Sequence, residues 1–287
     1  MTETPHVLGI IGYPLAHTYS PAIHNAMCKR LGLPYVYLPF IVAPRHLPNL
    51  LTCMRLTDVE GLNVTTPHKT RVVALLPSLD AEARAIGAVN TIALTRRGYR
   101  GYNTDAAGIA AALKRFTGET FRGRRVLLLG AGGAARAAAF AAARERAASI
   151  LVVNRTAAHA KRLSADLGRR FRRTAIFTMP LRTAGLRRAC TDVDTIIQAT
   201  NAPAGTLLPL AWKKFPRDAI GIELRYGPAP TAFERSAMEH GLVRVDGVTI
   251  LTLQAAASFR IWTGRSMDVP FALRIARKVS RTVAARV

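Results

Sequence analysis

The sequence has few of the features that mark exported, metal-binding or membrane proteins. Its three cysteines, Cys28, Cys53 and Cys190, are an odd number without a CxxC pair, which argues against a disulfide framework and a zinc site. No apolar run reaches the about 18 residues of a membrane span, and no basic segment precedes an apolar one near the N-terminus. We therefore expect a soluble cytoplasmic protein with no metal and no membrane partner.

Acidic residues are also scarce. The 287 residues include 17 Asp and Glu against 41 Lys and Arg, which gives a formal net charge of +24. Such a balance is compatible with nucleic-acid binding. The basic residues are mostly arginines spread along the whole chain, however, and no basic strand with interleaved aromatic residues occurs. We therefore do not expect a nucleic-acid partner, although the size of the excess has no explanation in the sequence.

Short apolar runs alternate with longer helical patterns, which is typical of parallel strands joined by helices in an α/β fold. The first predicted helix, 20–30, has Ser20 as its N-cap and Pro21 at its first helical position. Segments 90–95 and 100–103 are predicted to pair as a hairpin. Further helices are predicted at 45–54, 106–116, 135–146, 251–263 and 270–283. Further strands are predicted at 7–12, 35–41, 61–65, 125–129, 150–153, 175–178, 195–199, 219–224 and 243–245.

A glycine-rich turn, GAGGAAR at 130–136, directly follows the apolar strand 125–129 and opens a helix. Such a turn presents backbone N–H groups and the positive end of a helix to a pyrophosphate. The next strand ends in NRT at 154–156, where an enzyme using NAD usually has an acidic residue. Arg155 instead favours a 2'-phosphate, because its guanidinium can bind the phosphate and stack on adenine. The sequence therefore predicts NADP as cofactor.

The first half contains a candidate pair for acid–base chemistry. Lys69 follows a strand that ends at Pro67, and Asp105 lies where the two halves of the chain meet. A lysine held by a carboxylate can exchange a proton with a reacting carbonyl oxygen. The spacing alone equally allows a solvated Lys69, with Asp105 acting as the N-cap of the helix that follows.

Seven motifs follow one another along nearly the whole chain. They are HTYSP followed by HN (17–25), NVTTPHK (63–69), GAVNT (87–91), NTD (103–105), the glycine turn (130–134), NRT (154–156) and a C-terminal QAA with Phe259 and Trp262. In this order they resemble the motifs of the shikimate dehydrogenase family, which includes quinate/shikimate dehydrogenases. Seven motifs in order are far more specific than any one of them.

The resemblance implies a substrate-binding domain at 1–105, completed by 248–287, and a Rossmann NADP domain at 106–247. It implies reversible hydride transfer between NADPH and 3-dehydroshikimate to give shikimate, a step of aromatic amino acid biosynthesis, with the substrate and the nicotinamide held between the domains. Lys69 would be the catalytic acid or base and Asp105 its partner. A monomer or a homodimer is expected.

The resemblance also assigns binding residues. Contacts to a shikimate-like ring are expected from Thr18, Ser20, Asn63, Thr65, Lys69, Asn90, Asp105, Tyr226 and Gln254. Contacts to NADP are expected from Gly130, Ala131, Gly132, Gly133, Ala134, Asn154, Arg155 and Thr156, with Thr200, Leu224 and Gly247 nearer the nicotinamide.

The sequence departs from the family pattern at several of these segments. Thr18 replaces the first serine of the substrate pair, and Glu223 replaces the usual aspartate before Tyr226. Two alternatives therefore stay open: a paralogue that acts on quinate or another ring hydroxy acid, with NAD as a possible cofactor, and a binding protein without turnover. The retained Lys69 and Asp105 argue against the second, because a pure binder has little use for an acid–base pair.

Overall fold

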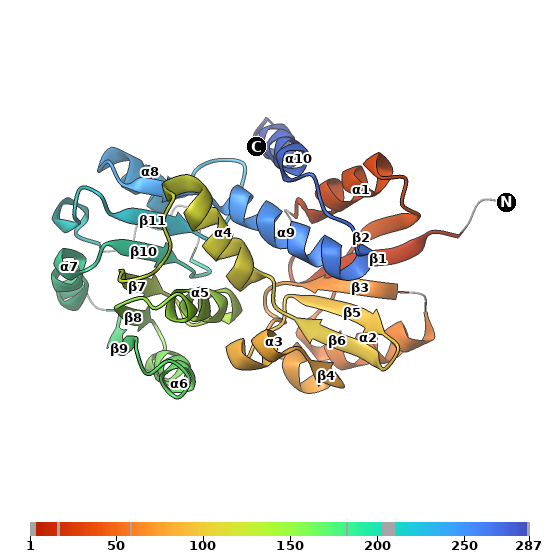
Figure 1. The fold of residues 1–287 in the computed structure, drawn as a ribbon, viewed down its shortest axis with the longest axis horizontal. Coiled ribbons are helices and arrows are strands. Elements are labelled where there is room, and N and C mark those ends of the chain that lie inside the picture. Colours follow the sequence, from red (N-terminus) through yellow and green to blue (C-terminus); the bar gives the residue numbers. More distant parts are fainter. Residues whose placement is uncertain (1–3, 16–17, 58, 182, 203–209, 286–287) are drawn as a thin grey trace. The chain divides into compact units, whose positions relative to one another are not determined.

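The structure is a computed structural model that describes residues 4–15, 18–57, 59–181, 183–202 and 210–285. The chain forms two compact units, one made of Met1–Asp105 with Thr252–Val287 and the other of Ala106–Leu251. Each unit has its own six-stranded sheet with helices around it (Figure 1). The predicted α/β class is confirmed, and the C-terminal helices return to the first unit as expected.

The first unit has a mixed sheet with the strand order β2-β1-β3-β5-β6-β4. Parallel strands β1, β2 and β3 form one half, and the antiparallel hairpin of β5 and β6 pairs with β3. Its strands are β1 (His6–Gly12), β2 (Tyr35–Ile41), β3 (Val59–Val64), β4 (Ser78–Leu79), β5 (Thr91–Thr95) and β6 (Gly98–Tyr102). Its helices are α1 (Ser20–Arg30), α2 (Leu47–Cys53), α3 (Ala81–Ile86), part of α9 (Gly247–Thr263) and α10 (Val269–Ala284), with short 3-10 turns η1 (Pro44–His46), η2 (Met54–Leu56) and η3 (Val72–Leu75).

Helix α9 is fixed to the sheet of the first unit by a tryptophan. The indole Nε1 of Trp262 donates to the carbonyl oxygen of Ile92 at 2.9 Å. Gly61 makes this approach possible, because a Cβ there would lie 2.2 Å from that nitrogen. Phe259, one turn earlier in α9, is fully buried. This anchor places the C-terminal end of α9 against β3 and β5.

The second unit has a parallel sheet with the strand order β12-β11-β10-β7-β8-β9. The order reverses between β7 and β10, which is the switch point where such sheets bind ligands beyond the carboxyl ends of their strands. Its strands are β7 (Arg125–Leu129), β8 (Ser149–Asn154), β9 (Ala175–Pro180), β10 (Thr195–Gln198), β11 (Ile220–Glu223) and β12 (Val243–Val245). Its helices are α4 (Asp105–Thr117), α5 (Gly133–Arg144), α6 (Ala157–Gly168), α7 (Thr183–Asp192) and α8 (Ala232–Glu239), with η4 (Trp212–Lys214).

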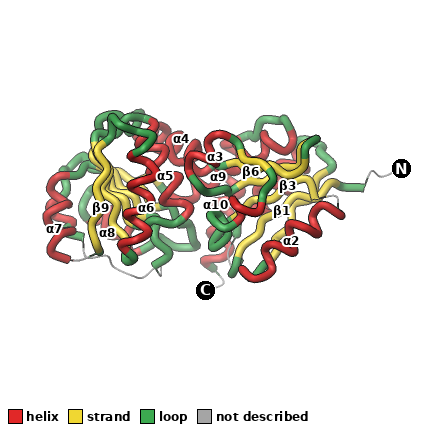
Figure 2. The backbone as a smooth tube through the Cα atoms, turned by 90° about the horizontal axis from the view of Figure 1, so that it is seen from below, coloured by secondary structure: helices red, strands yellow, loops and turns green. Residues whose placement is uncertain are grey.

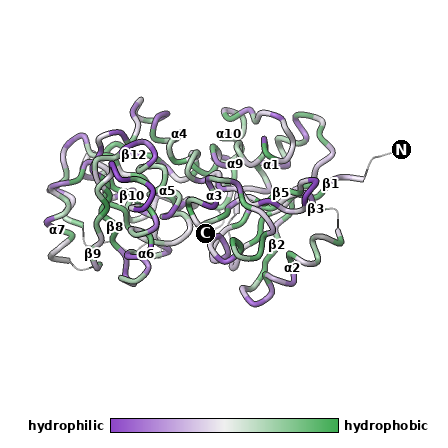
Figure 3. Tube along the Cα trace, turned by 60° about the horizontal axis from the view of Figure 1, so that its bottom comes forward, coloured by the Kyte–Doolittle hydropathy of each residue, from purple (hydrophilic) through white to green (hydrophobic). Residues whose placement is uncertain are grey.

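The central strands of the second unit's sheet are buried between helices, as their composition requires. Strand β7 is a continuous apolar run from Val126 to Leu129, and all four residues are buried. Helices α5 and α6 pack on β7, β8 and β9, while α7 and α8 pack on β7, β11 and β12 (Figure 2). Figure 3 colours the region of β8 mainly as hydrophobic, with hydrophilic stretches in the surrounding loops and helices. Alanines dominate α5 and let it approach the sheet closely.

The structure corrects several details of the predicted elements. Helix α1 begins at Ser20, so its N-cap position is Tyr19, without a side-chain cap, and the prediction that Ser20 caps the helix is wrong. The predicted helix 45–54 is divided into η1, α2 and the start of η2. Strand β4 and helix α3 were not predicted. Asp80 caps α3 by accepting from the N–H of Ala83 at 2.7 Å, and Gly87 ends it with a φ of 68°.

Among the described residues, no helix is both long enough and apolar enough to cross a membrane.

Candidate active site

Lys69 lies in the turn that follows β3, and backbone hydrogen bonds hold this turn on both sides. The N–H of Thr65 donates to the carbonyl oxygen of Ile11 at 2.9 Å, and the N–H of Val89 donates to that of Lys69 at 2.8 Å. The fully buried His68 contacts the carbonyl oxygen of Val42 through Nε2 at 2.7 Å. The backbone that carries the Lys69 side chain is therefore fixed before any ligand binds.

The ammonium of Lys69 donates to Oδ2 of Asp105 at 2.6 Å. The two side chains are only 16% and 11% exposed, so the pair is largely screened from water. The second carboxylate oxygen, Oδ1, accepts from Nδ2 of Asn90 at 2.8 Å. Asp105 is the first residue of α4 and its carboxylate turns to Lys69 and Asn90. Of the two interpretations that the spacing allowed, the structure therefore has the paired one.

Three side-chain amides from different parts of the chain meet beside this pair. Asn63 lies in β3 one residue before its end, Asn90 precedes β5 and Gln254 lies in α9, and all three are buried. Nδ2 of Asn90 is 3.1 Å from Oε1 of Gln254, and Nδ2 of Asn63 is 3.1 Å from the carbonyl oxygen of Asn90. The sequence placed these residues in one site together with Lys69 and Asp105, and the fold brings all five together.

Thr18 and Ser20 lie at the beginning of α1 and contact each other. The N–H of Ser20 donates to Oγ1 of Thr18 at 3.4 Å, and the Ser20 side chain is buried. His17, the first residue of the corresponding motif, lies outside the described residues. Thr65 is half-buried directly after β3, and its methyl group fills the space beside Gly12, where a Cβ would lie 2.5 Å from it. These residues belong to the same unit as Lys69.

Helix α1 is connected to the amides by two stacked rings. The imidazole of His24 lies parallel to the ring of Tyr37, with centroids 4.4 Å apart, and the Tyr37 hydroxyl donates to Oδ1 of Asn63 at 2.7 Å. Neither nitrogen of His24 has a hydrogen-bond partner within the part of the chain that the structure describes. Complete burial lowers the pKa of His24 to about 3, so this imidazole is neutral at physiological pH and packs as an aromatic ring.

In the second unit, the glycine turn lies at the switch point of the sheet. Gly130 has a φ of 116°, and a Cβ there would lie 2.7 Å from the carbonyl oxygen of Ala199, so only glycine fits between the ends of β7 and β10. Ala131 and Gly132 lead into α5, which begins at Gly133 and Ala134. The N-cap Gly132 has open space around it and gives no side-chain cap, so the N–H groups of the first turn are open to an anion.

The strand beside the glycine turn carries the predicted 2'-phosphate segment. The N–H of Gly130 donates to the carbonyl oxygen of Val153 at 2.8 Å, which joins the ends of β7 and β8. Asn154 ends β8 and donates from Nδ2 to the carbonyl oxygen of Thr156 at 2.9 Å. Arg155 projects from this turn as an exposed side chain. The glycine turn and an exposed cation beside it fit NADP, which carries a pyrophosphate and a further phosphate.

The remaining predicted cofactor residues follow β10, β11 and β12. The N–H groups of Thr200 and Leu224 donate to the side-chain and backbone oxygens of Gln198, at 3.2 and 3.1 Å. Gly247 touches the backbone of Arg225 so closely that a Cβ would lie 1.9 Å from its carbonyl oxygen. Tyr226, predicted to contact substrate, follows in the same loop and is half-buried in the second unit.

Glu223, the last residue of β11, holds this loop through hydrogen bonds that its carboxylate accepts. It is 1% exposed, and its carboxylate accepts from the N–H of Arg225 at 3.0 Å and from the hydroxyl of Thr231 at 2.7 Å. Burial raises the pKa of Glu223 to about 7, and the hydrogen bonds that it accepts offset only part of that effect.

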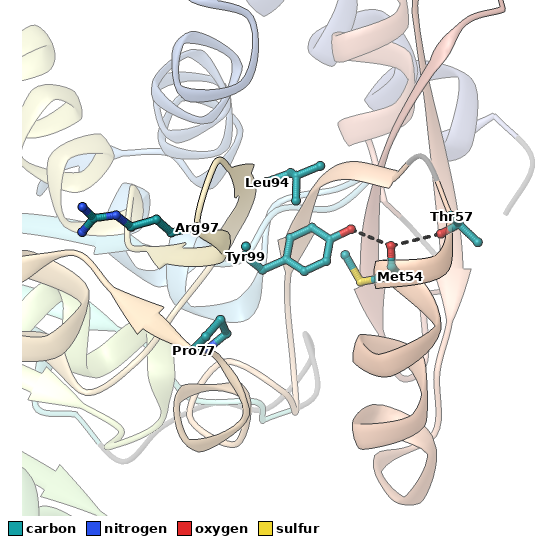
Figure 4. Close-up of a pocket in the computed structure, with 7 residues that line it drawn as sticks. Met54, Thr57, Pro77, Leu94, Arg97 and Tyr99 are labelled. Atoms are coloured by element: carbon teal, nitrogen blue, oxygen red, sulfur yellow. Dashed lines mark hydrogen bonds between the residues drawn. The ribbon is translucent and has the colours of Figure 1, made fainter.

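A pocket of about 440 Å³ lies elsewhere on the first unit, where β5 and β6 meet the end of α2 (Figure 4). The hydroxyl of Tyr99 points to the carbonyl oxygen of Met54 there, at 2.8 Å. Arg97 is the one charged side chain in its lining. Its lining consists of Met54, Thr57, Pro77, Leu94, Arg97, Gly98 and Tyr99. An apolar hollow with a single cation contains no acid–base pair, so this pocket is not the reaction site.

The sequence analysis missed the hydroxyl groups that contact the amides. Thr91, Thr104 and Ser258 are buried and hydrogen-bond to Asn63, Asn90 or both. Thr91 and Thr104 each neighbour a predicted residue in a motif. Ser258 gave one signal, its spacing of four residues from Gln254 in a helix, which places both on the same face.

A doubly wound sheet with a glycine turn, together with a second α/β unit that holds an ammonium and carboxylate pair, defines the class of two-domain nicotinamide-dependent oxidoreductases. Two family models match this chain. A model described as the shikimate dehydrogenase substrate binding domain matches residues 10–92, and a model described as shikimate/quinate 5-dehydrogenase matches residues 111–214.

Individual relatives agree with these models. The chain is 39% identical over 273 residues to the NADP(+) shikimate dehydrogenase of Methanopyrus kandleri, covering 92% of each chain. It is similar in structure to shikimate 5-dehydrogenase from Thermus thermophilus in complex with NADP(H) and shikimate, with a TM-score of 0.82, 32% identity and coverage of 96% and 99%. Quinate dehydrogenase from Corynebacterium glutamicum, in complex with NAD, has a TM-score of 0.84 at 25% identity, with coverage of 94% and 98%. The chain belongs to the shikimate dehydrogenase family.

Proposed function

We propose that the protein is an NADP-dependent shikimate dehydrogenase, which reversibly converts 3-dehydroshikimate and NADPH to shikimate and NADP. The main observation behind this proposal is the pairing of Lys69 and Asp105 in a chain of this family. Nζ of Lys69 lies 2.6 Å from Oδ2 of Asp105, and both side chains are largely buried among amides. A binding protein without turnover gains nothing from a buried ammonium and carboxylate, whose desolvation costs free energy.

Lys69 acts as the acid or base of this reaction. In the direction of reduction, its ammonium donates a proton to the substrate oxygen that becomes the hydroxyl, and in oxidation it takes the proton back. Asp105 keeps the ammonium aimed through its Oδ2, while Asn90 holds the carboxylate through Oδ1. Bound NADPH supplies the hydride.

The first unit binds the ring acid. Asn63, Asn90 and Gln254 surround the Lys69 and Asp105 pair with polar groups that match ring hydroxyls. The remaining proposed contacts in this unit come from hydroxyl-bearing side chains that match a carboxylate or a further hydroxyl: Thr18, Ser20 and Thr65.

The second unit binds NADP. The uncapped first turn of α5, from Gly132 to Ala134, holds the pyrophosphate, with Gly130 and Ala131 allowing its close approach. Arg155 binds the 2'-phosphate, flanked by Asn154 and Thr156. Thr200, Leu224 and Gly247 line the nicotinamide end at the carboxyl ends of β10, β11 and β12.

The test is absorbance of reduced nicotinamide with purified protein in four pairings, shikimate or quinate with NADP or NAD. We expect the highest kcat/KM with shikimate and NADP. Faster turnover of quinate with NAD would replace the proposed substrate and cofactor, and no turnover in any pairing would refute the proposed activity. The Lys69→Ala variant, assayed in parallel, controls for contaminating dehydrogenases from the expression host.

A further inference from the structure

Three hydroxyl groups meet in a cluster beneath the amides of the proposed substrate site. Oγ of Ser258 lies 2.7 Å from Oγ1 of Thr91 and 3.0 Å from Oγ1 of Thr104, and the two threonine oxygens are 3.4 Å apart. The three residues are at most 4% exposed. They come from β5, from the connection between β6 and α4, and from α9. We call Thr91, Thr104 and Ser258 the hydroxyl cluster.

Each of the three amides contacts this hydroxyl cluster. Nδ2 of Asn63 donates to Ser258 at 3.1 Å and to Thr91 at 3.2 Å. Nδ2 of Asn90 donates to Thr104 at 2.9 Å, and Thr104 donates to Oε1 of Gln254 at 3.3 Å. The cluster therefore joins Asn63, Asn90 and Gln254 into one network.

A backbone carbonyl group fixes which way the amide of Asn63 points. Its Nδ2 faces the carbonyl oxygen of Asn90 at 3.1 Å, and a carbonyl oxygen only accepts hydrogen bonds. Oδ1 consequently faces the hydroxyl of Tyr37 at 2.7 Å. The two hydrogens of Nδ2 are used by Asn90 and by the hydroxyl cluster, so Asn63 offers a ligand an acceptor oxygen. A ligand group that binds Asn63 must be a donor, as a ring hydroxyl is.

Ser258 differs from the two threonines in what it connects. In sequence, Thr91 follows Asn90 and Thr104 precedes Asp105, and the pairing of Thr91 with Tyr102 between β5 and β6 already brings these two segments together. Ser258 is the member that belongs to α9, and its hydroxyl also reaches the carbonyl oxygen of Gln254 one turn earlier, at 3.2 Å. Its hydrogen bonds therefore connect the helix of Gln254 to the amides carried by the sheet.

We propose that Ser258 is a positioning residue for substrate: by accepting from Nδ2 of Asn63 it reinforces the hold that the Asn90 carbonyl has on that amide, and through α9 it keeps Gln254 in register with Asn63. This inference rests on the proposed function for the identity of the ring acid. Ser258 is not needed to attach α9 to the sheet, because one turn later Trp262 anchors the helix to β5 by its own hydrogen bond to Ile92. The proposed role of Ser258 is therefore limited to the geometry of ligand binding.

The test compares Ser258→Ala, which removes the hydroxyl, with Ser258→Cys, which keeps nearly the same volume but hydrogen-bonds weakly. The matched control is Ser236→Ala, since Ser236 is a buried serine in helix α8 of the second unit. For both Ser258 variants we expect the KM for shikimate to rise about tenfold, the effect of losing a buried hydrogen bond. We expect kcat within about threefold of wild type and an unchanged KM for NADP.

A double-mutant cycle with Asn63 separates positioning from general loosening. If Ser258 acts through Asn63, Ser258→Ala should raise KM much less in the Asn63→Ala background than alone. Equal rises in both backgrounds would overturn the inference, as would a Ser258→Cys variant with wild-type KM. A KM increase in the Ser236→Ala control equal to that of Ser258→Ala would overturn it as well.

The inference and the proposed function fail in different ways. If the wild-type protein turns over no ring acid, the proposed function is refuted, and the Ser258 inference is then decided by crystal structures of wild type and Ser258→Ala. A rotated Asn63 amide or a displaced Gln254 in the variant would support positioning. Both side chains unchanged to within coordinate error would overturn it.

Discussion

Replacing Lys69 by arginine separates proton transfer from charge stabilisation. The guanidinium can keep the ion pair with Asp105, because it donates to carboxylates at similar distances, but it remains protonated throughout the accessible pH range. Lys69→Ala removes both the proton and the charge. If Lys69 transfers a proton, the two variants should lose turnover to a similar extent.

Both variants should lose turnover, and Lys69→Ala should also lose stability. A positioned acid or base contributes about 10² to 10⁴ in rate, so each variant should lose at least about a hundredfold in kcat, or about 2.7 kcal/mol. Lys69→Ala also leaves the Asp105 side chain, 11% exposed, with Asn90 as its remaining side-chain donor among the residues that the structure describes. Losing a hydrogen bond to a buried charge costs about 1.5 to 3 kcal/mol of stability, whereas Lys69→Arg should lose less.

The assay is the initial rate with saturating shikimate and NADP, combined with urea unfolding and titration of NADPH binding by fluorescence. NADPH affinity should change little in either variant, because the proposed cofactor contacts come from the second unit. An arginine variant that keeps more than about a tenth of wild-type kcat would show that Lys69 serves as a fixed charge. Near wild-type kcat in Lys69→Ala would remove Lys69 from the mechanism.

Three further predictions concern other groups. Asp105→Asn should lower kcat at least about tenfold, because an amide must turn its nitrogen toward either the ammonium of Lys69 or Nδ2 of Asn90, and retained kcat would contradict this geometry. Arg155→Ala should raise the Kd for NADPH about tenfold or more and hardly change that for NADH, and equal losses would show that Arg155 does not contact the 2'-phosphate. The pKa of Glu223 rises from 4.5 to about 7 on folding, so between these two pH values the folded protein binds a proton that the unfolded chain has lost. The free energy of unfolding should therefore fall as the pH rises from about 5 to 8. Glu223→Gln should flatten this dependence in urea unfolding and add about 1 to 3 kcal/mol at pH 8, whereas an unchanged slope would assign the dependence to other groups.

Strongly periodic and apolar segments could be predicted from the sequence because each carries its own signal. Strands β7 and β12 were predicted with the observed ends, and α1 with the observed range. The two-residue strand β4 and the six-residue helix α3 are too short for a period to appear. Tertiary pairing defines β4, which is a strand because Ser78 and Leu79 align with Arg100 and Gly101 of β6.

Members of the site could be predicted, whereas their hydrogen bonding could not. Lys69 and Asp105 are 36 residues apart, and their spacing allowed either a pair or two separate surface roles. The pairing of Lys69 with Asp105 depends on the conformation of the turn after β3. The N–H of Val89 holds this turn by donating to the carbonyl oxygen of Lys69, and sequence periodicity does not predict such a contact. Ser258 was missed for a similar reason, since a lone serine on a helix face is an ordinary residue until its partners are known.

The register of three strands explains why the motif residues form one site. Asn63 of β3 pairs with Thr91 of β5, and Thr91 pairs with Tyr102 of β6, which brings the start of the NTD segment to the same place. Because side chains alternate between the faces of a strand, a slip of one residue in either pairing would turn Asn63 or Thr91 to the opposite face. It would also take the carbonyl oxygen of Asn90 away from Nδ2 of Asn63, where it fixes the direction of that amide. The polarity that the site offers to a ring hydroxyl is therefore set by backbone pairing, and side-chain substitutions such as Ser258→Ala test how tightly it is held.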